Sequence, residues 1–359
     1  MANGFFPYKK ALQVFGKSPE QLLNLGISET SLPRFARSST DNRELKSWSL
    51  HEMPEIGAQI GFMKKPRKPL AISIFVTKGG VLKSSLTLNL ARMAALHGIR
   101  TCVVGLDMQG DISAALSEDP IPDDDSSFDE ALEQMNRLRG LADVFAQDCR
   151  LDEVIRSTDI ATLFYIPETP ELVALDQSLI NRNRREYWLK DQVIDPLKAQ
   201  FDLVLMDCSP NWNRLITNAL VASDGLISPL ECKINNFRNF KTFRVLLDEF
   251  KRDMKVNLRQ LFVPTRLSSN RKLSREICEW YQHNLDECTA GAIRESVPGE
   301  ESVAVRTSVI EYAPASPAAD EMRALIEEIW TALSSDHVKA PLKKRAPTPS
   351  RPETEAPCL

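Results

Sequence analysis

A short stretch rich in glycine, lysine and serine, TKGGVLKSS at residues 77–85, restricts the fold of this 359-residue chain more than any other feature. It follows AISIFV, an apolar run that predicts a buried strand, and it precedes LTLNLARMAALHG, which predicts a helix. In a strand–turn–helix unit of this kind, the backbone N–H groups of the turn converge on one place, and the helix dipole favours negative charge there. The sequence therefore predicts a phosphate-binding loop.

The residue types of this loop suit a nucleotide. Gly79 and Gly80 would let the backbone approach phosphates, because glycine has no Cβ. Lys83 would reach the terminal phosphate oxygens, and the Ser84 hydroxyl would ligate magnesium. The common pattern GxxxxGK[ST] is not met, because a leucine directly precedes Lys83 and a second lysine precedes the glycine pair. The alternative interpretation is a glycine turn whose lysines face solvent.

Strand and helix patterns alternate from residue 70 to residue 334. Short apolar runs are separated by helical stretches, which is the pattern of a mostly parallel α/β sheet flanked by helices. The predicted strands are AISIFV, TCVVGL, TLFYIP, FDLVLMD, GLISPL and QLFVPT. An acidic, proline-containing segment at residues 117–133 predicts a surface loop that leads into a helix.

The two ends of the chain differ from this α/β region. Residues 1–63 predict a small helical domain: SPEQLLNLGI starts a helix, and SETSLPRFARS predicts a second one that carries Arg34 and Arg37. A helix, a glycine turn and a second helix with arginines is typical of a helix-turn-helix, and a solvated helical appendage is the alternative. Residues 64–69 predict a linker, and the proline-rich residues 335–359 predict a disordered tail.

Charge and composition exclude several classes of protein. The net charge is −4, but residues 1–69 hold 11 basic and 6 acidic residues, so they carry +5 and the remainder carries −9. This distribution indicates a polyanionic partner for the N-terminal part. No apolar run approaches the roughly 20 residues of a membrane span, and no signal peptide is visible. The seven cysteines form no CxxC pair, which favours reduced thiols in the cytoplasm over disulfides or a zinc site.

Three motifs together resemble the ParA/MinD family of ATPases. KGGVLKSS at 78–85 resembles the deviant Walker A motif of that family, in which the first lysine is diagnostic. VVGLDMQGD at 103–111 resembles the switch segment D-x-D-P-Q-G-N, with Asp107 on the second aspartate and Gly105 in place of the first. FDLVLMDCSPNWNRLITNAL at 201–220 resembles the Walker B segment and ends its strand at Asp207.

The resemblance implies a role for each motif residue. Lys78 is expected to reach the nucleotide of the partner subunit in a sandwich homodimer, and Lys83 the nucleotide of its own subunit. Asp107 is expected to orient the attacking water, while Ser84 and Asp207 hold magnesium. The resemblance continues through ASDGLISPLECK, FVPTRLSSNRKLSREI and TSVIEYAPASPAADEM, to about residue 334. The implied nucleotide-binding residues are Lys78, Gly79, Gly80, Val81, Leu82, Lys83, Ser84, Ser85, Thr265, Arg266 and Pro298.

Within this family the chain is most similar to plasmid-type ParA partition proteins with an N-terminal extension, because ELKSWSLHEMPEIGAQIG at 44–61 resembles their approach helix. The resemblance implies an ATPase that uses ATP/ADP and Mg²⁺, binds DNA without sequence preference as an ATP-bound dimer, and is released when a centromere-bound ParB-like partner stimulates hydrolysis. It also implies nucleoid association in a bacterial cytoplasm. Arg271, Lys272 and Arg275 are the candidate DNA contacts of the ATPase region, with a solvated helix face as the alternative.

Three other functions are open to a chain with these motifs. A MinD-like membrane protein needs an amphipathic C-terminal helix, whereas the tail here is rich in proline. A nitrogenase-reductase-like electron carrier needs paired cluster cysteines between the Walker motifs, where only Cys102 and Cys149 occur. The third is a repressor of its own partition operon that keeps the nucleotide as a switch, with turnover weakened by Gly105 and Leu82. Operator binding in the ADP state, compared with DNA-stimulated turnover, distinguishes it.

Overall fold

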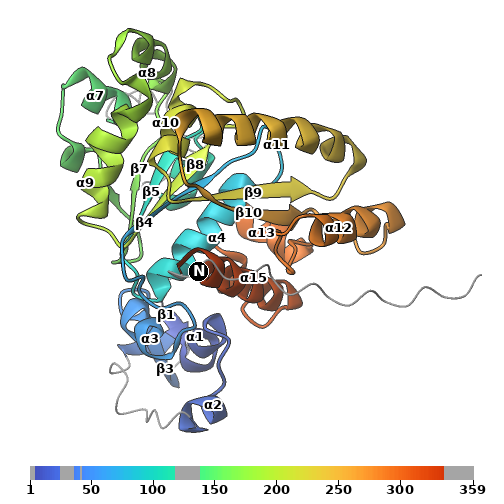
Figure 1. The fold of residues 1–359 in the computed structure, drawn as a ribbon. Coiled ribbons are helices and arrows are strands. Elements are labelled where there is room, and N and C mark those ends of the chain that lie inside the picture. Colours follow the sequence, from blue (N-terminus) through green and yellow to red (C-terminus); the bar gives the residue numbers. More distant parts are fainter. Residues whose placement is uncertain (1–4, 25–35, 41–42, 118–137, 335–359) are drawn as a thin grey trace, which may run out of the picture.

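The structure is a computed structural model that describes residues 5–24, 36–40, 43–117 and 138–334. Its centre is a seven-stranded sheet in the order β10-β9-β4-β8-β5-β7-β6, parallel except for β6, which pairs antiparallel with β7 (Figure 1). All the strands predicted from residue 70 onward are confirmed. Their bounds are β4 (Leu70–Ile74), β5 (Thr101–Leu106), β6 (Arg156–Ser157), β7 (Leu163–Ile166), β8 (Leu203–Cys208), β9 (Gly225–Glu231) and β10 (Arg259–Thr265).

Helices cover both faces of this sheet. One face packs against α4 and α15, and the other packs against α9, α10 and α11 (Figure 1). The helices of this region are α4 (Lys83–Leu96), α5 (Asp111–Leu116), α7 (Leu141–Ala146), α8 (Leu172–Ser178), α9 (Asp195–Lys198), α10 (Arg214–Ala222), α11 (Ile234–Met254), α12 (Lys272–Asn284), α13 (Val297–Ala304), α14 (Val309–Tyr312) and α15 (Pro317–Ser334). Short 3-10 segments lie at Leu151–Glu153, Leu179–Asn181 and Arg185–Tyr187, and a π-helical segment at Lys190–Ile194.

The central strands β5 and β8 are mostly apolar because both faces of the sheet are buried there. In β8, Leu203 and Leu205 belong to the core under α4, whereas Val204 and Met206 belong to the core on the opposite face. The alternation follows from the two-residue repeat of a strand. β8 lies between β4 and β5, so the carboxyl ends of these three strands meet at the middle of one sheet edge. The loops that leave this edge carry the candidate site.

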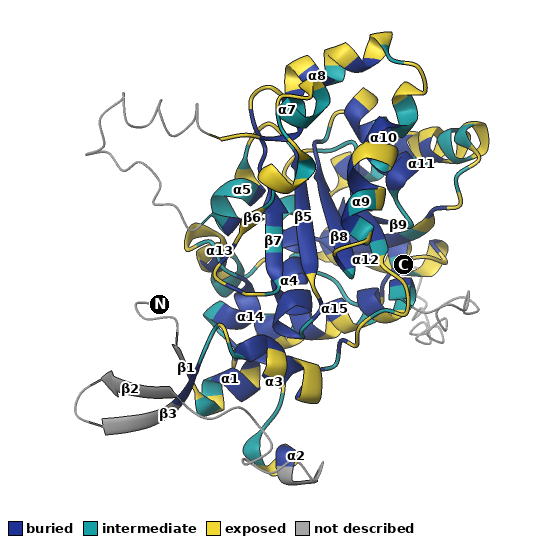
Figure 2. Cartoon of the chain, turned by 90° about the vertical axis from the view of Figure 1, so that its left-hand side faces the viewer, coloured by how far each residue is buried: buried dark blue, intermediate teal, exposed yellow. Residues whose placement is uncertain are grey.

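The N-terminal part is mixed rather than helical, which corrects the sequence prediction. It contains β1 (Phe5–Pro7), β2 (Ala36–Thr40) and β3 (Arg43–Ser49) in an antiparallel sheet of order β1-β3-β2. The helices of the segment are α1 (Tyr8–Val14), α2 (Pro19–Asn24) and α3 (Met53–Ile60). Figure 2 shows α1 and α3 next to the α/β region.

Two specific predictions in this segment are wrong. Arg37 lies in β2, in register with Lys46 of β3, and not on a second helix. Residues 44–49 of the expected approach helix belong to strand β3, and only the later part is helical, as α3. The physical reason is that the run of serine and threonine in β2 has low helix propensity, so pairing with β3 is more favourable than a helix. The predicted start of α2 is confirmed, because Ser18 Oγ accepts from Gln21 N at 3.3 Å.

The N-terminal segment packs directly on the α/β region. A Cβ at Gly57 of α3 would lie 1.9 Å from the carbonyl oxygen of Leu96, so only glycine lets α3 approach the end of α4 so closely. His97 follows α4, and its ring contacts those of Phe15 and Phe62 at centroid distances of 5.2 and 4.6 Å. Residues from both parts belong to one apolar core. The division of the chain at residue 63 stays a prediction.

Several predictions concern residues beyond these limits. Arg34, nearly all of the acidic segment 117–133 and the tail 335–359 lie outside the described residues. In the described part, no helix has the length and apolarity to cross a membrane. The six cysteines that the structure describes are free thiols, and no cluster of metal-ligating side chains is found among the described residues.

Candidate nucleotide-binding site

The loop between β4 and α4 has the geometry of a phosphate-binding turn. Gly80 has a φ of +71°, and Leu82, which caps α4, has a φ of +68°. A left-handed conformation costs a residue with a Cβ about 1–2 kcal/mol. Leu82 thus adopts the backbone conformation that a glycine would adopt without a steric penalty. The loop departs from the common motif in the type of this residue and not in its backbone conformation.

The two lysines of the loop occupy different places. Lys83 is 7% exposed, and its Nζ donates to the carbonyl oxygen of Lys78 at 3.2 Å. Burial lowers the pKa of Lys83, while the nearby Asp207 and Asp107 carboxylates oppose this shift. The Lys83 side chain lines the large cavity beside the loop, whereas Lys78 does not belong to that lining.

Asp207 joins β8 to the first turns of α4. Its Oδ2 accepts from the Ser84 hydroxyl at 2.7 Å, and its Oδ1 accepts from the Thr87 hydroxyl at 2.8 Å. Asp207 is fully buried, which raises its pKa to about 6 despite these two hydrogen bonds and the charge of Lys83. Sequence reasoning missed Thr87. The available signal was its position four residues after Lys83, which places both on one helix face.

The switch segment reaches the same cavity. Asp107 follows β5, and its Oδ1 accepts from the backbone N–H of Gln109 at 3.3 Å. Asp107, Gln109 and Asp111 all line the cavity together with Ser84. In register across the sheet, Gly105 of β5 lies opposite Asp207 of β8. The structure therefore brings together Lys83, Ser84, Asp107 and Asp207, as the sequence predicts.

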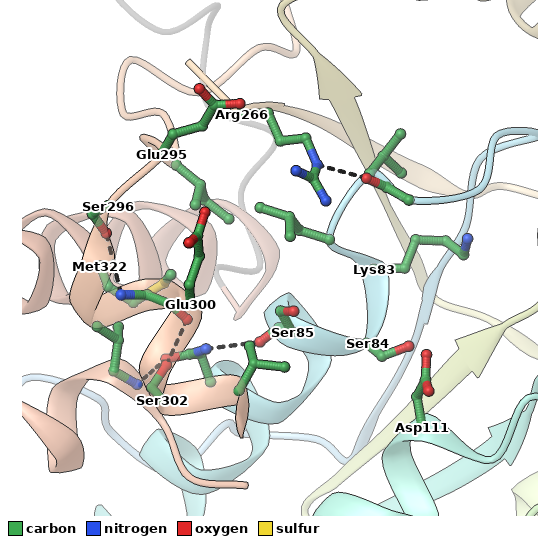
Figure 3. Close-up of a pocket in the computed structure, with 18 of the residues that line it drawn as sticks. Lys83, Ser84, Ser85, Asp111, Arg266, Glu295, Ser296, Glu300, Ser302 and Met322 are labelled. Atoms are coloured by element: carbon green, nitrogen blue, oxygen red, sulfur yellow. Dashed lines mark hydrogen bonds between the residues drawn. The ribbon is translucent and has the colours of Figure 1, made fainter. Parts of the chain in front are cut away.

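The cavity has a volume of about 630 Å³, within the range of sites that hold a nucleotide-sized molecule. Its far wall comes from Arg266, directly after β10, from residues 293–296 before α13, and from α13 itself (Figure 3). Arg266 has a φ of +49°, and its Nε donates to the carbonyl oxygen of Gly80 at 2.7 Å, which ties this wall to the loop. Residues of the wall that sequence reasoning missed include Ile293, Arg294, Glu295, Ser296, Gly299, Glu300, Ser302 and Val303.

The remaining predicted nucleotide contacts are less direct. Gly79, Val81 and Ser85 line the cavity, whereas Thr265 and Pro298 do not. Thr265 ends β10 fully buried, and its Oγ1 has no hydrogen-bond partner among the described residues. Pro298 lies in the first turn of α13, and Ser296 and Gly299, which flank it and Val297 in the chain, line the cavity.

The three candidate DNA contacts lie at the start of α12, apart from the cavity lining. Arg271, Lys272 and Arg275 are exposed. Lys272 pairs with Glu276 at 3.5 Å, and Arg275 donates to the carbonyl oxygen of Ser269. An exposed ion pair of this kind contributes little to stability, so Lys272 remains available to an anion.

The sheet is mainly parallel, the cavity is lined by a glycine turn, a buried lysine and a serine, and that serine is hydrogen-bonded to a strand-end aspartate. These features define a P-loop nucleotide-binding protein. The chain belongs to the family AAA_31, described as an AAA domain, whose profile matches residues 70–260. Together with the relatives below, this places it among the ParA/MinD-type ATPases.

The curated relatives include partitioning proteins. The chain is 27% identical to the chromosome partitioning protein ParA of Myxococcus xanthus over 209 residues, which is 58% of this chain and 69% of that protein. It is 28% identical to the sporulation initiation inhibitor protein Soj of Bacillus subtilis, over 45% of this chain and 58% of Soj. It is 24% identical to the cell division protein PomZ of Myxococcus xanthus, over 85% of this chain and 89% of PomZ.

Solved structures share the fold. A putative plasmid partition protein from Borrelia burgdorferi bound to AMPPNP superposes with a TM-score of 0.56 at 21% identity, over 72% of this chain and 98% of that chain. The ATP complex of a Cyanothece McdA variant gives a TM-score of 0.62 at 15% identity, over 76% of this chain and 99% of that one. Cobyrinic acid a,c-diamide synthase from Mycobacterium smegmatis, with an ATP analog and magnesium, gives a TM-score of 0.60 at 21% identity, over 77% of this chain and 100% of that one.

Proposed function

We propose that this chain is a DNA-partition ATPase. The observation that carries the proposal is that one cavity joins a buried lysine, a serine hydrogen-bonded to a strand-end aspartate, and a second aspartate from the switch loop. The first three groups suit binding of Mg²⁺ and nucleotide phosphates, and the fourth suits placement of a water molecule. The partitioning relatives support this cellular role.

The donor set fits magnesium and ATP. Ser84 and Asp207 present a hydroxyl and a carboxylate within 2.7 Å of each other, and Mg²⁺ prefers such oxygen ligands. When bound, Mg²⁺ would neutralise charge on the phosphates. Lys83 would bind the terminal phosphate oxygens, and the N–H groups at the start of α4 would bind the phosphates behind them. Asp107 would accept a hydrogen bond from the attacking water and hold it in line.

Lys78 extends the proposal to a dimer. Its side chain lies outside the lining of the cavity in its own subunit. A second subunit that faces the loop would receive Lys78 at its own nucleotide, so ATP binding and dimerisation would be coupled. The dimer would bind DNA without sequence preference through the exposed Arg271, Lys272 and Arg275, which would contact phosphates rather than base edges.

The cycle then needs a partner. A ParB-like protein bound at a centromere would stimulate hydrolysis and release the ATPase from nucleoid DNA, so that the cargo follows it through a bacterial cytoplasm. The N-terminal segment would add recognition of an operator sequence. Its α1 and α2, followed in the chain by the paired strands β2 and β3, support this role, with Arg34 and Arg37 as the proposed contacts.

Binding to DNA in each nucleotide state tests the proposal. Fluorescence anisotropy would compare operator and scrambled duplexes with ATP, with ADP and without nucleotide. The proposal predicts ATP-dependent binding to both duplexes, with weaker, sequence-selective binding added by the N-terminal segment. Selective binding in ADP together with no ATP-dependent binding would favour the repressor instead. Equal, weak binding in all states would contradict both.

A further inference from the structure

A second carboxyl group lies beside the switch segment, and the nucleotide site described above does not use it. Glu168 follows β7, which neighbours β5 in the sheet (Figure 1). Glu168 is only 8% exposed. A Cβ built at Gly105 of β5 would lie 2.3 Å from Glu168 Cγ and 2.6 Å from its Cδ. The Glu168 side chain therefore fills the space that a side chain at position 105 would need.

The direction of this space matters. Gly105 is in register with Asp207 of β8, and residues in register on neighbouring parallel strands present their side chains to the same face. Glu168 thus brings a carboxyl group from the next strand to the place beside Asp207 where position 105 has none. The switch pattern that residues 103–111 resemble has an aspartate at this position.

Glu168 also holds the helix that follows the switch. Its Oε2 accepts from the backbone N–H of Ser113 at 2.9 Å, and its own N–H donates to Ser113 Oγ at 2.8 Å. Ser113 belongs to α5, which begins at Asp111 directly after the loop that carries Asp107 and Gln109. The two reciprocal hydrogen bonds fix α5 against the end of β7, and with it one end of the switch loop.

Glu168 interacts electrostatically with the two aspartates of the site, Asp107 and Asp207. Burial raises the pKa of Glu168 to about 8, opposed by the hydrogen bonds with Ser113 and reinforced by the Asp207 and Asp107 carboxylates. Its Oε1 is buried and has no hydrogen-bond partner among the described residues. A buried acid with one unpartnered oxygen costs folding free energy. This cost favours a functional reason for the position of Glu168.

We infer that Glu168 is a positioning residue for ATP hydrolysis: it replaces the missing side chain at position 105 and, through Ser113, holds the switch loop so that Asp107 faces the cavity. This inference rests on the proposed ATPase function. It assigns Glu168 no contact with the nucleotide, so its loss should change turnover more than nucleotide binding.

Two readouts on the full-length protein test the inference. The first is hydrogen exchange of residues 107–116, and the second is the kcat and KM of ATP hydrolysis. Glu168→Ala should speed exchange in this segment and lower kcat about tenfold, with KM changed less than about threefold. Glu168→Gln keeps an oxygen that accepts from Ser113 N–H and should remain close to wild type. Glu171→Ala, an exposed acid of the same loop, is the control and should change neither readout.

A double variant tests the replacement itself. Gly105→Asp in the Glu168→Ala background restores a carboxyl group to the vacated space and should recover part of kcat, whereas Gly105→Asp alone should destabilise the protein. If Glu168→Ala fails to fold, Ser113→Ala removes one of the two hydrogen bonds and should show the same faster exchange and lower kcat.

The possible failures are distinct. Wild-type exchange and kcat in Glu168→Ala would overturn the inference, as would a lower melting temperature with unchanged kcat. A wild-type protein that does not hydrolyse ATP would overturn the proposed function, and the exchange of residues 107–116 would still decide whether Glu168 holds the switch.

Discussion

The Ser84 hydroxyl donates to Asp207 Oδ2 across 2.7 Å, from the first turn of α4 to the end of β8. These residues are 123 positions apart in the chain, and the sheet order β4-β8-β5 brings them together. The bond holds the serine hydroxyl and the carboxylate close together. A bound magnesium ion would replace the hydrogen bond between these two oxygens. The structure thus already holds together the two side chains that we propose as magnesium ligands.

Removing the charge of Asp207 should weaken nucleotide binding only when magnesium is present. Asp207→Asn keeps the shape of the side chain but loses the charge that stabilises the ion, so we expect affinity for Mg–ATP to fall about tenfold or more. Titration with a fluorescent ATP analogue, with magnesium and with EDTA, measures this. Thr87→Val removes the other hydroxyl bound to Asp207 and is the matched control, with a smaller expected loss. An equal loss in EDTA would argue against a metal role.

Lys78 should matter for the dimer rather than for the nucleotide. Because Lys78 lies outside the lining of its own cavity, Lys78→Ala should leave ATP affinity within about threefold of wild type while reducing ATP-dependent dimerisation and turnover. Lys83→Ala is the comparison variant, and it should weaken ATP binding itself. Analytical ultracentrifugation with ATP and with ADP follows the dimer. An ATP-dependent dimer of normal stability in Lys78→Ala would contradict a role across the interface.

The contact between the N-terminal segment and α4 should be sensitive to acid. Burial lowers the pKa of His97 from 6.5 to about 4, helped by the charges of Lys64 and Lys17 and opposed by the hydrogen bond with the Met93 carbonyl. Between pH 6.5 and pH 4, His97 is therefore protonated in the unfolded chain but mostly neutral in the folded chain. Stability should be complete above pH 6.5 and should fall by about 3 kcal/mol as the pH drops to 4.

Replacing His97 tests this dependence. His97→Gln cannot titrate, so its free energy of unfolding should vary less with pH between 6.5 and 4 than that of the wild type. Urea denaturation at several pH values gives the comparison. His283→Gln, at an exposed position of α12, is the control and should keep the wild-type profile. Parallel profiles for the wild type and His97→Gln would show that acid acts elsewhere.

The start of α12 should bind DNA through charge alone. Arg271→Ala, Lys272→Ala or Arg275→Ala should weaken ATP-dependent binding to every duplex alike, and should reduce the salt dependence by about 0.9 log units per log unit of salt for each lost phosphate contact. Filter binding at several salt concentrations measures the slope. Glu276→Gln removes the acid that pairs with Lys272 and should strengthen binding. Unchanged slopes in all the basic variants would leave a solvated helix face as the better interpretation.

Much of the ATPase region could be predicted from the sequence, because its signals are local. Each apolar run lies next to its own helix, and the glycine–lysine loop carries its chemistry within nine residues, at 77–85. Arg266 is predicted only through the family resemblance, because its contact with Gly80 depends on the folded sheet. The residues of α13 that line the cavity could not be predicted from local signals. Their sequence shows no polar pattern that distinguishes them from an ordinary surface loop.

Two other features escaped sequence reasoning for physical reasons. The pairing of β2 with β3 depends on tertiary contacts of a short polar segment whose intrinsic preference is weak. Glu168 looks like one acid in a loop, and only its approach to Gly105, 63 positions earlier in the chain, shows why a carboxyl group is there. In both cases the missing information is which distant residue lies opposite.

The rate of ATP hydrolysis with and without duplex DNA tests the central claim most directly. Wild-type protein with Mg²⁺ should hydrolyse ATP slowly and faster when DNA is added, and faster again with the protein from the adjacent gene if that protein is the ParB-like partner. Asp107→Ala should bind ATP and DNA but show no turnover, because it lacks the group that orients water. A wild-type rate equal to that of Asp107→Ala, under all three conditions, would contradict the claim that this chain is a DNA-partition ATPase.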